Sequence, residues 1–205
     1  MRFNYSWLIL YFLLAFFTYL MLRITFPYFN MNDTQGFLML KQSIIENKVW
    51  KTAFYIHVFS SCFLLFAGFT QFSNRILKDH KSIHRNIGKM YVFILLFVSG
   101  PAGFIMSINA NGGIYSRIGF LLLSSLWLLF TALAWLYVIK GDFGRHRVFM
   151  ILSFSLTLSA LTLRLWKYCL AGIFHPAPMD LYRIVAWLGW VPNLLVALVL
   201  VQKRK

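Results

Sequence analysis

Charged residues divide this sequence into long uncharged stretches, and that spacing constrains the fold more than any other feature. Twenty uncharged residues separate Arg2 from Arg23, and further uncharged stretches of 23, 27, 22 and 19 residues follow. A helix needs about 20 apolar residues to cross about 30 Å of hydrocarbon. The spacing therefore predicts membrane-spanning helices. The composition agrees, because 60% of the residues are hydrophobic and 12% are charged, whereas soluble domains have roughly 45–50% and 25%.

Six spans are predicted. Five follow from the charge-free stretches, and the sixth is interrupted only by Arg164 and Lys167. The first stretch exceeds the 7–15 apolar residues of a signal peptide and lacks small residues after it, so we expect a retained helix. The predicted fold is an all-α polytopic integral membrane protein with one transmembrane domain, residues 1–205, and helices at about 5–26, 52–74, 89–109, 115–139, 147–172 and 181–201.

The distribution of basic residues predicts the orientation of these spans. Six spans place both termini on the same side, and 12 of the 20 Lys and Arg residues fall there. Cytoplasmic loops carry an excess of Lys and Arg, so both termini are expected in the cytoplasm. The net charge of +15 is thereby attributed to membrane orientation rather than to nucleic-acid binding, and membrane lipids are the expected surroundings. Cys62 and Cys169 lie in apolar stretches without the spacing of metal ligands.

The longest segment predicted outside the cytoplasm is 27–51. Asp33 and Thr34 could cap a helix, and apolar residues then recur at near-helical spacing up to Lys48. A short amphipathic helix on the outer membrane surface fits this pattern. The alternative is a lid over an outer cavity.

Ionisable side chains within apolar stretches are the first candidates for function, because they are costly in lipid. His57 is predicted in the outer leaflet, either hydrogen-bonded between helices or as a ligand to haem or metal. Arg164 is also predicted toward the outer side. A guanidinium stays charged, so it needs an acceptor: a helix carbonyl, one of a few carboxylates (Asp33, Glu46, Asp180), or an external anion.

A second group of candidates lies at the predicted cytoplasmic border. The pairs His84-Arg85 and His146-Arg147 each open a helix after a basic turn, which is a weak internal repeat. They either orient the spans and contact lipid phosphates, or form an anion or cofactor pocket. His84 and His146 are the candidate metal ligands. Asn193, after Pro192, is a further intramembrane polar residue, with a structural or a ligand-binding role.

These residues together resemble a family of bacterial six-helix predicted membrane proteins of unknown function. The resemblance covers about residues 51–197. It is carried by His57 with Gly68 and Gln71, His84 through Tyr91, Gly119-Phe120 with Trp127, Gly141-Asp142, His146-Arg147 with Met150, Arg164, and Trp190 through Asn193. It implies a multi-pass protein of the bacterial cytoplasmic membrane but no activity. A remoter similarity is to membrane cytochromes b, in which transmembrane histidines hold haem.

Three functions remain open from the sequence. The leading prediction is a redox or cofactor-binding protein in which His84 and His146 hold a haem b or metal, or contact a quinone, while Arg85 and Arg147 neutralise the cofactor's acidic groups. His57 and Arg164 would then form a separate outer site. The alternatives are a lipid or small-amphiphile binding or transport protein, and an assembly partner of other membrane proteins. The sequence leaves open whether the chain is an enzyme, and the protein partners are unknown.

Overall fold

The computed structural model describes residues 5–203, with side chains from residue 12 onward except at residues 14 and 74. Arg2, Arg204 and Lys205, which contribute to the charge asymmetry above, lie outside the described residues. The described chain is all-helical and contains no strand. Its elements are α1 (Tyr5–Thr25), η1 (Phe26–Asn30), η2 (Gly36–Lys41), α2 (Lys48–Gln71), α3 (Asn74–Asp79), α4 (Lys81–Ile94), η3 (Leu95–Ser99), α5 (Gly100–Ile108), α6 (Ile114–Ile139), α7 (Phe143–Thr157), α8 (Ser159–Phe174), α9 (Pro178–Leu188) and α10 (Val191–Gln202).

Five helical stretches among the described residues are long and apolar enough to cross a membrane: 48–71, 81–108, 114–139, 143–174 and 178–202. The sixth predicted span, 5–26, coincides with α1. Its crossing of the membrane, and the cytoplasmic placement of both termini, remain predictions.

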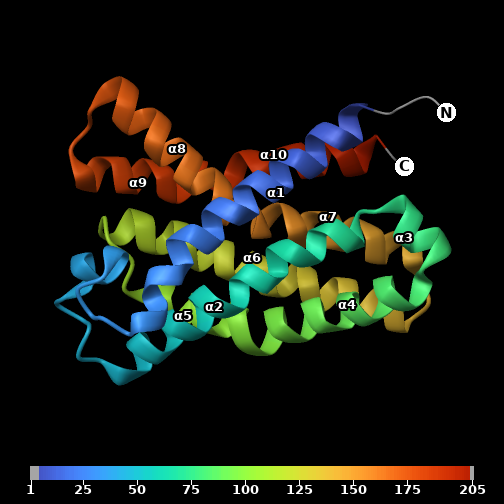
Figure 1. Ribbon diagram of the computed structural model, residues 1–205, viewed down its shortest axis with the longest axis horizontal. Helices are drawn as coiled ribbons and strands as arrows, with labels where there is room; N and C mark the ends of the chain where they lie inside the picture. The colour runs from blue at the N-terminus through green and yellow to red at the C-terminus, as the bar shows by residue number, and fades with distance from the viewer. Residues whose placement is uncertain (1–4, 204–205) are drawn as a thin grey trace.

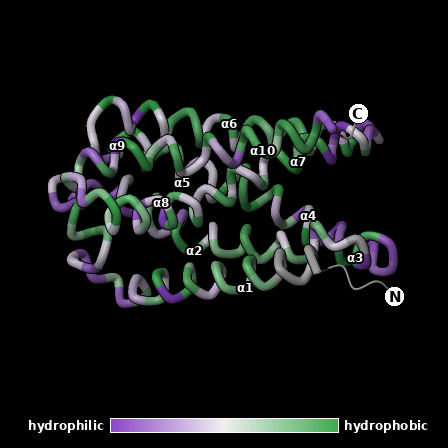
Figure 2. Tube along the Cα trace, turned by 90° about the horizontal axis from the view of Figure 1, so that it is seen from above, coloured by the Kyte–Doolittle hydropathy of each residue, from purple (hydrophilic) through white to green (hydrophobic). Residues whose placement is uncertain are grey.

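The helices form an elongated bundle (Figure 1). α2 packs against α1, α4 and α5, while α6 packs against α5, α7 and α9. α1 begins and α10 ends at one end of the bundle, which we call the terminal end (Figure 1). The α8–α9 turn and the segment from η1 to η2 lie at the other end, which we call the distal end. Figure 2 shows that hydrophilic residues gather toward the two ends, as expected for a bundle whose middle lies in hydrocarbon.

The main core lies where α2, α4, α6, α7 and α10 meet. Gly68 of α2 lets Phe154 of α7 approach its backbone, because an added Cβ would clash with that ring. Around this contact are the buried side chains Leu64, Ala67, Tyr91, Val92, Leu95, Trp127, Leu156 and Trp190. Close packing against small residues is typical of helix association in membranes.

Three of the predicted spans are not continuous α-helices. Pro101 cannot donate a hydrogen bond to the carbonyl one turn earlier, and the chain widens into a π-helical turn at η3 just before it. Pro192 interrupts the last span in the same way, so that α9 ends at Leu188 and α10 begins at Val191. The fifth span divides at Leu158 into α7 and α8.

The amphipathic helix predicted within 27–51 is wrong. The segment instead forms η1 and η2, and the left-handed backbone of Gly36, with φ of +50°, separates them. Leu38 is fully buried with Tyr28 and Trp50 in a second apolar cluster. The segment therefore packs into the bundle rather than lying on its surface.

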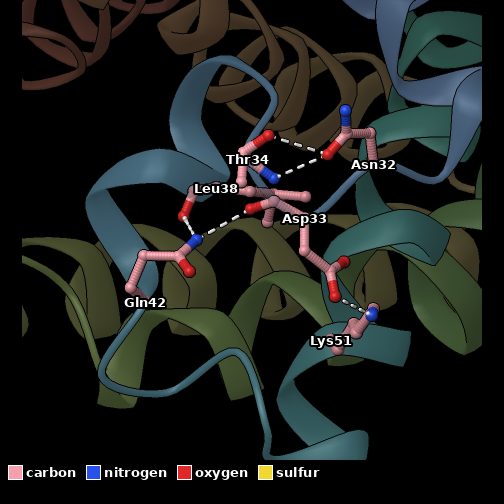
Figure 3. Close-up of polar contacts among 6 residues, drawn as sticks. All are labelled: Asn32, Asp33, Thr34, Leu38, Gln42 and Lys51. Atoms are coloured by element: carbon pink, nitrogen blue, oxygen red, sulfur yellow. Dashed lines mark hydrogen bonds and ion pairs between the residues drawn. The ribbon is translucent and has the colours of Figure 1, made fainter.

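The predicted capping roles of Asp33 and Thr34 are also wrong. The hydroxyl and N–H of Thr34 both donate to Asn32 Oδ1, while Asp33 pairs with Lys51 of α2 at 2.6 Å (Figure 3). Gln42 donates to the backbone carbonyls of Asp33 and Leu38. These bonds fix the loop to the start of α2, above the site described next.

Candidate functional site

A cavity of about 590 Å³ occupies the distal half of the bundle. α1, α2 and η2 line one side of it, and α5, α6, α8 and α9 line the others. Most of the wall is apolar or aromatic, including Tyr28, Trp50, Phe54, Met106, Trp127 and Leu163. Ligand sites commonly have volumes of about 300–1,000 Å³ and apolar walls with a few polar groups. The cavity is therefore of the size and character that holds one small amphiphilic molecule.

His57 reaches this cavity from α2. Its Nδ1 lies 2.9 Å from the carbonyl oxygen of Ser99, in the π-helical turn η3. A carbonyl oxygen only accepts hydrogen bonds, so Nδ1 carries a proton, and in the neutral form of the ring the lone pair is then on Nε2. Gly103 of α5 permits this position, because an added Cβ would lie 2.9 Å from the ring. Trp127 holds the ring edge-on, with the two ring centroids 6.3 Å apart.

Arg164 reaches the same cavity from α8. One of its terminal nitrogens, Nη1, donates to the carbonyl of Ala160 in the preceding turn. The guanidinium has five N–H groups, and no further acceptor is found among the residues that the structure describes. His57 and Arg164 are thus brought together at one cavity, as the predicted outer site requires. That this site binds a ligand remains a prediction.

Two of the three carboxylates considered as acceptors for Arg164 are engaged elsewhere, and the third, Glu46, is exposed and forms no ion pair with any residue that the structure describes. Asp33 pairs with Lys51, and Asp180 pairs with Arg183 at 2.9 Å. Among residues 5–203, the remaining ion pair joins Arg145 to Asp142. Of the acceptors predicted for Arg164, the helix carbonyl is the one that the structure contains.

The described lining of the cavity carries basic groups and no carboxylate. Arg164 is joined there by Lys167 of α8 and Lys41 of η2. Lys41 is only 3% exposed, and its ammonium donates to the carbonyl of Asn109. Positive charge within low-dielectric walls raises the local concentration of anions. The electrostatics of the cavity therefore favour a ligand with a negatively charged group.

A network of hydroxyl groups extends from Thr157 in the cavity wall into the bundle. Thr157 accepts a hydrogen bond from the indole N–H of Trp127 at 3.0 Å and bonds to Tyr91 at 2.8 Å. Tyr91 also bonds to Ser153, which bonds to Thr131 at 2.7 Å. These bonds join α4, α6 and α7 and fix the indole that holds His57. The sequence analysis did not identify this network, although its Ser and Thr residues stand within apolar stretches.

The inner candidates lie at the terminal end, away from the cavity. His84 and His146 are each the fourth residue of their helices, α4 and α7, and they are close enough for their charges to interact. His146 Nδ1 lies 2.9 Å from the carbonyl of Ala134, whereas the buried Nδ1 of His84 has no hydrogen-bond partner. The side-chain amide of Gln71 donates to the backbone carbonyl of His84 and not to its ring.

Arg85 and Arg147 are exposed beside these histidines and make no ion pair with any residue that the structure describes. This exposure suits contact with lipid phosphates as well as with the acidic groups of a cofactor. The inner candidates are thus clustered, with two arginines facing outward.

Asn193 joins three helices. Its amide nitrogen donates to Thr162 Oγ1 at 2.9 Å and lies within hydrogen-bond distance of the carbonyls of Ser155 and Gly189. Thr162 in turn donates to the Gly189 carbonyl. Asn193 therefore has the structural role of satisfying the backbone at the α9–α10 interruption.

Comparison with known proteins gives one match. A family model described as "Predicted membrane protein (DUF2306)" matches residues 54–201, which is well over half of the chain. The match includes each of the candidate site residues from His57 to Asn193. No curated protein and no solved structure matches.

Proposed function

The chain belongs to the DUF2306 family of predicted membrane proteins, and we propose that it binds a small membrane amphiphile with an anionic head group in the cavity around His57 and Arg164. The observation that carries the proposal is the half-buried guanidinium of Arg164. It lies on an apolar cavity and has no carboxylate partner among the described residues. An unpaired cation in such surroundings is costly. A bound carboxylate or phosphate would accept its remaining N–H groups in the bidentate geometry that guanidinium favours.

The rest of the cavity supports the same ligand class. The apolar and aromatic wall suits a hydrocarbon tail or a ring, and the unprotonated Nε2 of His57 can accept a hydrogen bond from a hydroxyl group. α1 and α8 line the cavity from the side, and both carry exposed apolar side chains such as Phe16 and Leu165. We therefore expect lipid against α1 and α8, so that a membrane amphiphile would enter from the bilayer.

The proposal is tested by titrating the protein, purified in a neutral detergent, with dodecyl phosphate and with uncharged dodecanol. Trp50 and Trp127 line the cavity, so tryptophan fluorescence reports occupancy. Charge-assisted hydrogen bonds contribute about 1.5–3 kcal/mol. Arg164→Gln is therefore expected to weaken dodecyl phosphate binding by about 10- to 150-fold and to leave dodecanol binding unchanged.

Arg75→Gln is the matched control, because it removes an exposed arginine in α3, at the opposite end of the bundle. It should leave binding at the wild-type level. Equal losses in the two variants, or equal affinities for dodecyl phosphate and dodecanol in the wild type, would refute the proposal.

A second candidate function is a redox or cofactor-binding role at the terminal end. It is favoured by the buried, unpartnered Nδ1 of His84 beside His146, whose Nδ1–H is held by the Ala134 carbonyl. A hydrogen bond from the second ring nitrogen to a carbonyl is typical of metal-ligating histidines, because it orients the ring. Among residues 5–203 no group of three or more His, Cys, Asp or Glu side chains is placed to hold a metal ion. This candidate therefore concerns a haem held by two histidines, or a quinone, rather than a fully protein-ligated ion.

A haem would supply one-electron chemistry, and Arg85 and Arg147 would neutralise its propionates. The test is the visible spectrum of the purified protein, oxidised and then dithionite-reduced, from cells supplied with a haem precursor. A Soret band that shifts on reduction, is lost in His146→Ala and persists in the exposed-residue control His80→Ala would support this role. A flat spectrum at full protein recovery would exclude the haem version. If another protein co-purifies with the wild type and still co-purifies with His146→Ala and with Arg164→Gln, the assembly role would be favoured instead.

A further inference from the structure

A second, smaller pocket of about 350 Å³ lies beside the cavity at the distal end. The turn after η2, the loop between α5 and α6 and the first turn of α6 form its wall. Its lining is mostly polar and includes Lys41, Ser43, Asn109, Asn111 and Arg117. No carboxylate lines it among the described residues. Two cations therefore face one polar pocket without an anion to balance them.

Lys41 is the most constrained of these groups. It is the last residue of η2 and is 3% exposed. Its ammonium nitrogen lies 5.5 Å from the ring centroid of Phe37 and 5.6 Å from that of Trp50. Its ammonium has three N–H donors, and the carbonyl of Asn109 accepts one of them. Burial, and to a smaller extent the charge of Arg117, lower the pKa of Lys41 to about 8. The protein thus holds an ammonium group where both desolvation and a neighbouring cation oppose its charge.

The loop before α6 and the first turn of α6 form part of the wall of this pocket through Gly112, Gly113 and Arg117. Gly112 and Gly113 line it with φ of +84° and +77°, a backbone region that residues with side chains rarely adopt. α6 begins directly after them, and the first N–H groups of a helix have no partner within it. The fully buried hydroxyl of Ser116 lies against Gly112 and has no hydrogen-bond partner.

We propose that this pocket binds a phosphate-type oxyanion between Lys41 and Arg117. The oxyanion would neutralise both cations and accept hydrogen bonds from Lys41 and from the loop before α6. Lys41 lines both the pocket and the cavity. The phosphate could therefore be free in solution or could be the head group of an amphiphile whose tail lies in the cavity. The pocket is formed independently of Arg164, so this inference does not rest on the proposed function.

The test is a calorimetric titration of the full-length protein, in neutral detergent at pH 7, with inorganic phosphate. Arg117 is exposed, so Arg117→Gln should fold normally; it is expected to weaken phosphate binding at least tenfold. Lys41→Gln should do the same if it folds. Lys48→Gln is the matched control, because it removes an exposed lysine at the same end of the bundle, outside the pocket. It should bind as the wild type does.

The two sources of phosphate are separated by repeating the titration with saturating dodecyl phosphate. If the head group of the amphiphile occupies the pocket, inorganic phosphate no longer binds. If the amphiphile stays at Arg164, both bind together, and the pocket is a separate site for free anions. Either result supports the oxyanion site. The proposal would be overturned if phosphate binding to the folded wild type does not saturate. It would also be overturned if Arg117→Gln and Lys48→Gln bind phosphate with equal affinity.

Discussion

Gly103→Ala is the most direct test of how His57 is positioned. The three atoms nearest to a Cβ added at Gly103 all belong to His57, and two of them, Cε1 and Nδ1, lie at 2.9 Å. Real Cβ atoms essentially never approach so closely, so either the ring or α5 must move. Movement of the ring stretches the bond from Nδ1 to the Ser99 carbonyl, and the freed carbonyl then lacks its partner.

The expected cost follows from the two effects. Overpacking in a well-packed interior costs about 1–3 kcal/mol. This range includes the weakening of the bond from Nδ1 to the Ser99 carbonyl when the His57 ring moves. Alanine also has a better helix propensity than glycine, by roughly 1 kcal/mol, and this gain must be subtracted. Gly172→Ala in α8 provides the correction, because a Cβ there meets no atom within 4 Å. Relative to Gly172→Ala, we expect Gly103→Ala to lower the free energy of unfolding by about 1–3 kcal/mol.

A double-mutant cycle makes the prediction specific to His57. Equilibrium unfolding in detergent is measured for Gly103→Ala, His57→Ala and the combination. Because His57 supplies all three nearest atoms, the penalty of Gly103→Ala should disappear in the His57→Ala background. If the effects of the two substitutions on the free energy of unfolding simply add, His57 does not lie against Gly103. The bond from Nδ1 to the Ser99 carbonyl, and with it the assignment of the lone pair to Nε2, would then be wrong.

Two further predictions concern the wall of the cavity and the neighbouring pocket. Thr157→Val should lower the free energy of unfolding by about 1–3 kcal/mol, because the buried indole N–H of Trp127 and the hydroxyl of Tyr91 lose a partner; an unchanged unfolding midpoint would contradict this. Sulfate, whose charge is constant between pH 6 and 9, should bind more weakly as the pH rises through about 8, since Lys41 then loses its proton. In Arg117→Gln this fall should move to higher pH, because a cation that opposes the charge of Lys41 is gone, and calorimetry at each pH measures both effects.

The spacing of charges predicts the five long apolar helical stretches but not their interruptions. The predicted span 115–139 corresponds to α6, which runs from Ile114 to Ile139. The span predicted at 147–172 divides at Leu158, and nothing local in the sequence marks that residue. Hydropathy reports the length of an apolar stretch, whereas a break in a helix depends on which carbonyls find partners on other helices. The same limitation explains the error within 27–51, where Lys41 is buried and bonds to Asn109, 68 residues further along the chain.

The site residues show a similar division. Isolated ionisable residues in apolar stretches led to His57 and Arg164, because their cost in lipid makes them conspicuous in any sequence. Lys41 was missed as a site residue because it stands in the amphipathic pattern of 27–51, where a lysine is expected to lie on the solvated face. Its proximity to Arg117 joins residues 76 positions apart in the sequence. Residue type alone carries no information about such pairs.

The polar residues of the bundle are best understood through the backbone groups that its helix interruptions leave unpaired. In hydrocarbon, each carbonyl released from a helix must be satisfied within the protein. His57 bonds to Ser99 at the π-helical turn, and Asn193 and Thr162 bond to Gly189 where α9 ends. The need to satisfy the Ser99 carbonyl accounts for the position of Nδ1 of His57. It does not explain Nε2, which remains available at the cavity, nor the guanidinium of Arg164, which uses one of its five donors on its own helix. The part of each side chain that the backbone does not require is the part that a ligand can use.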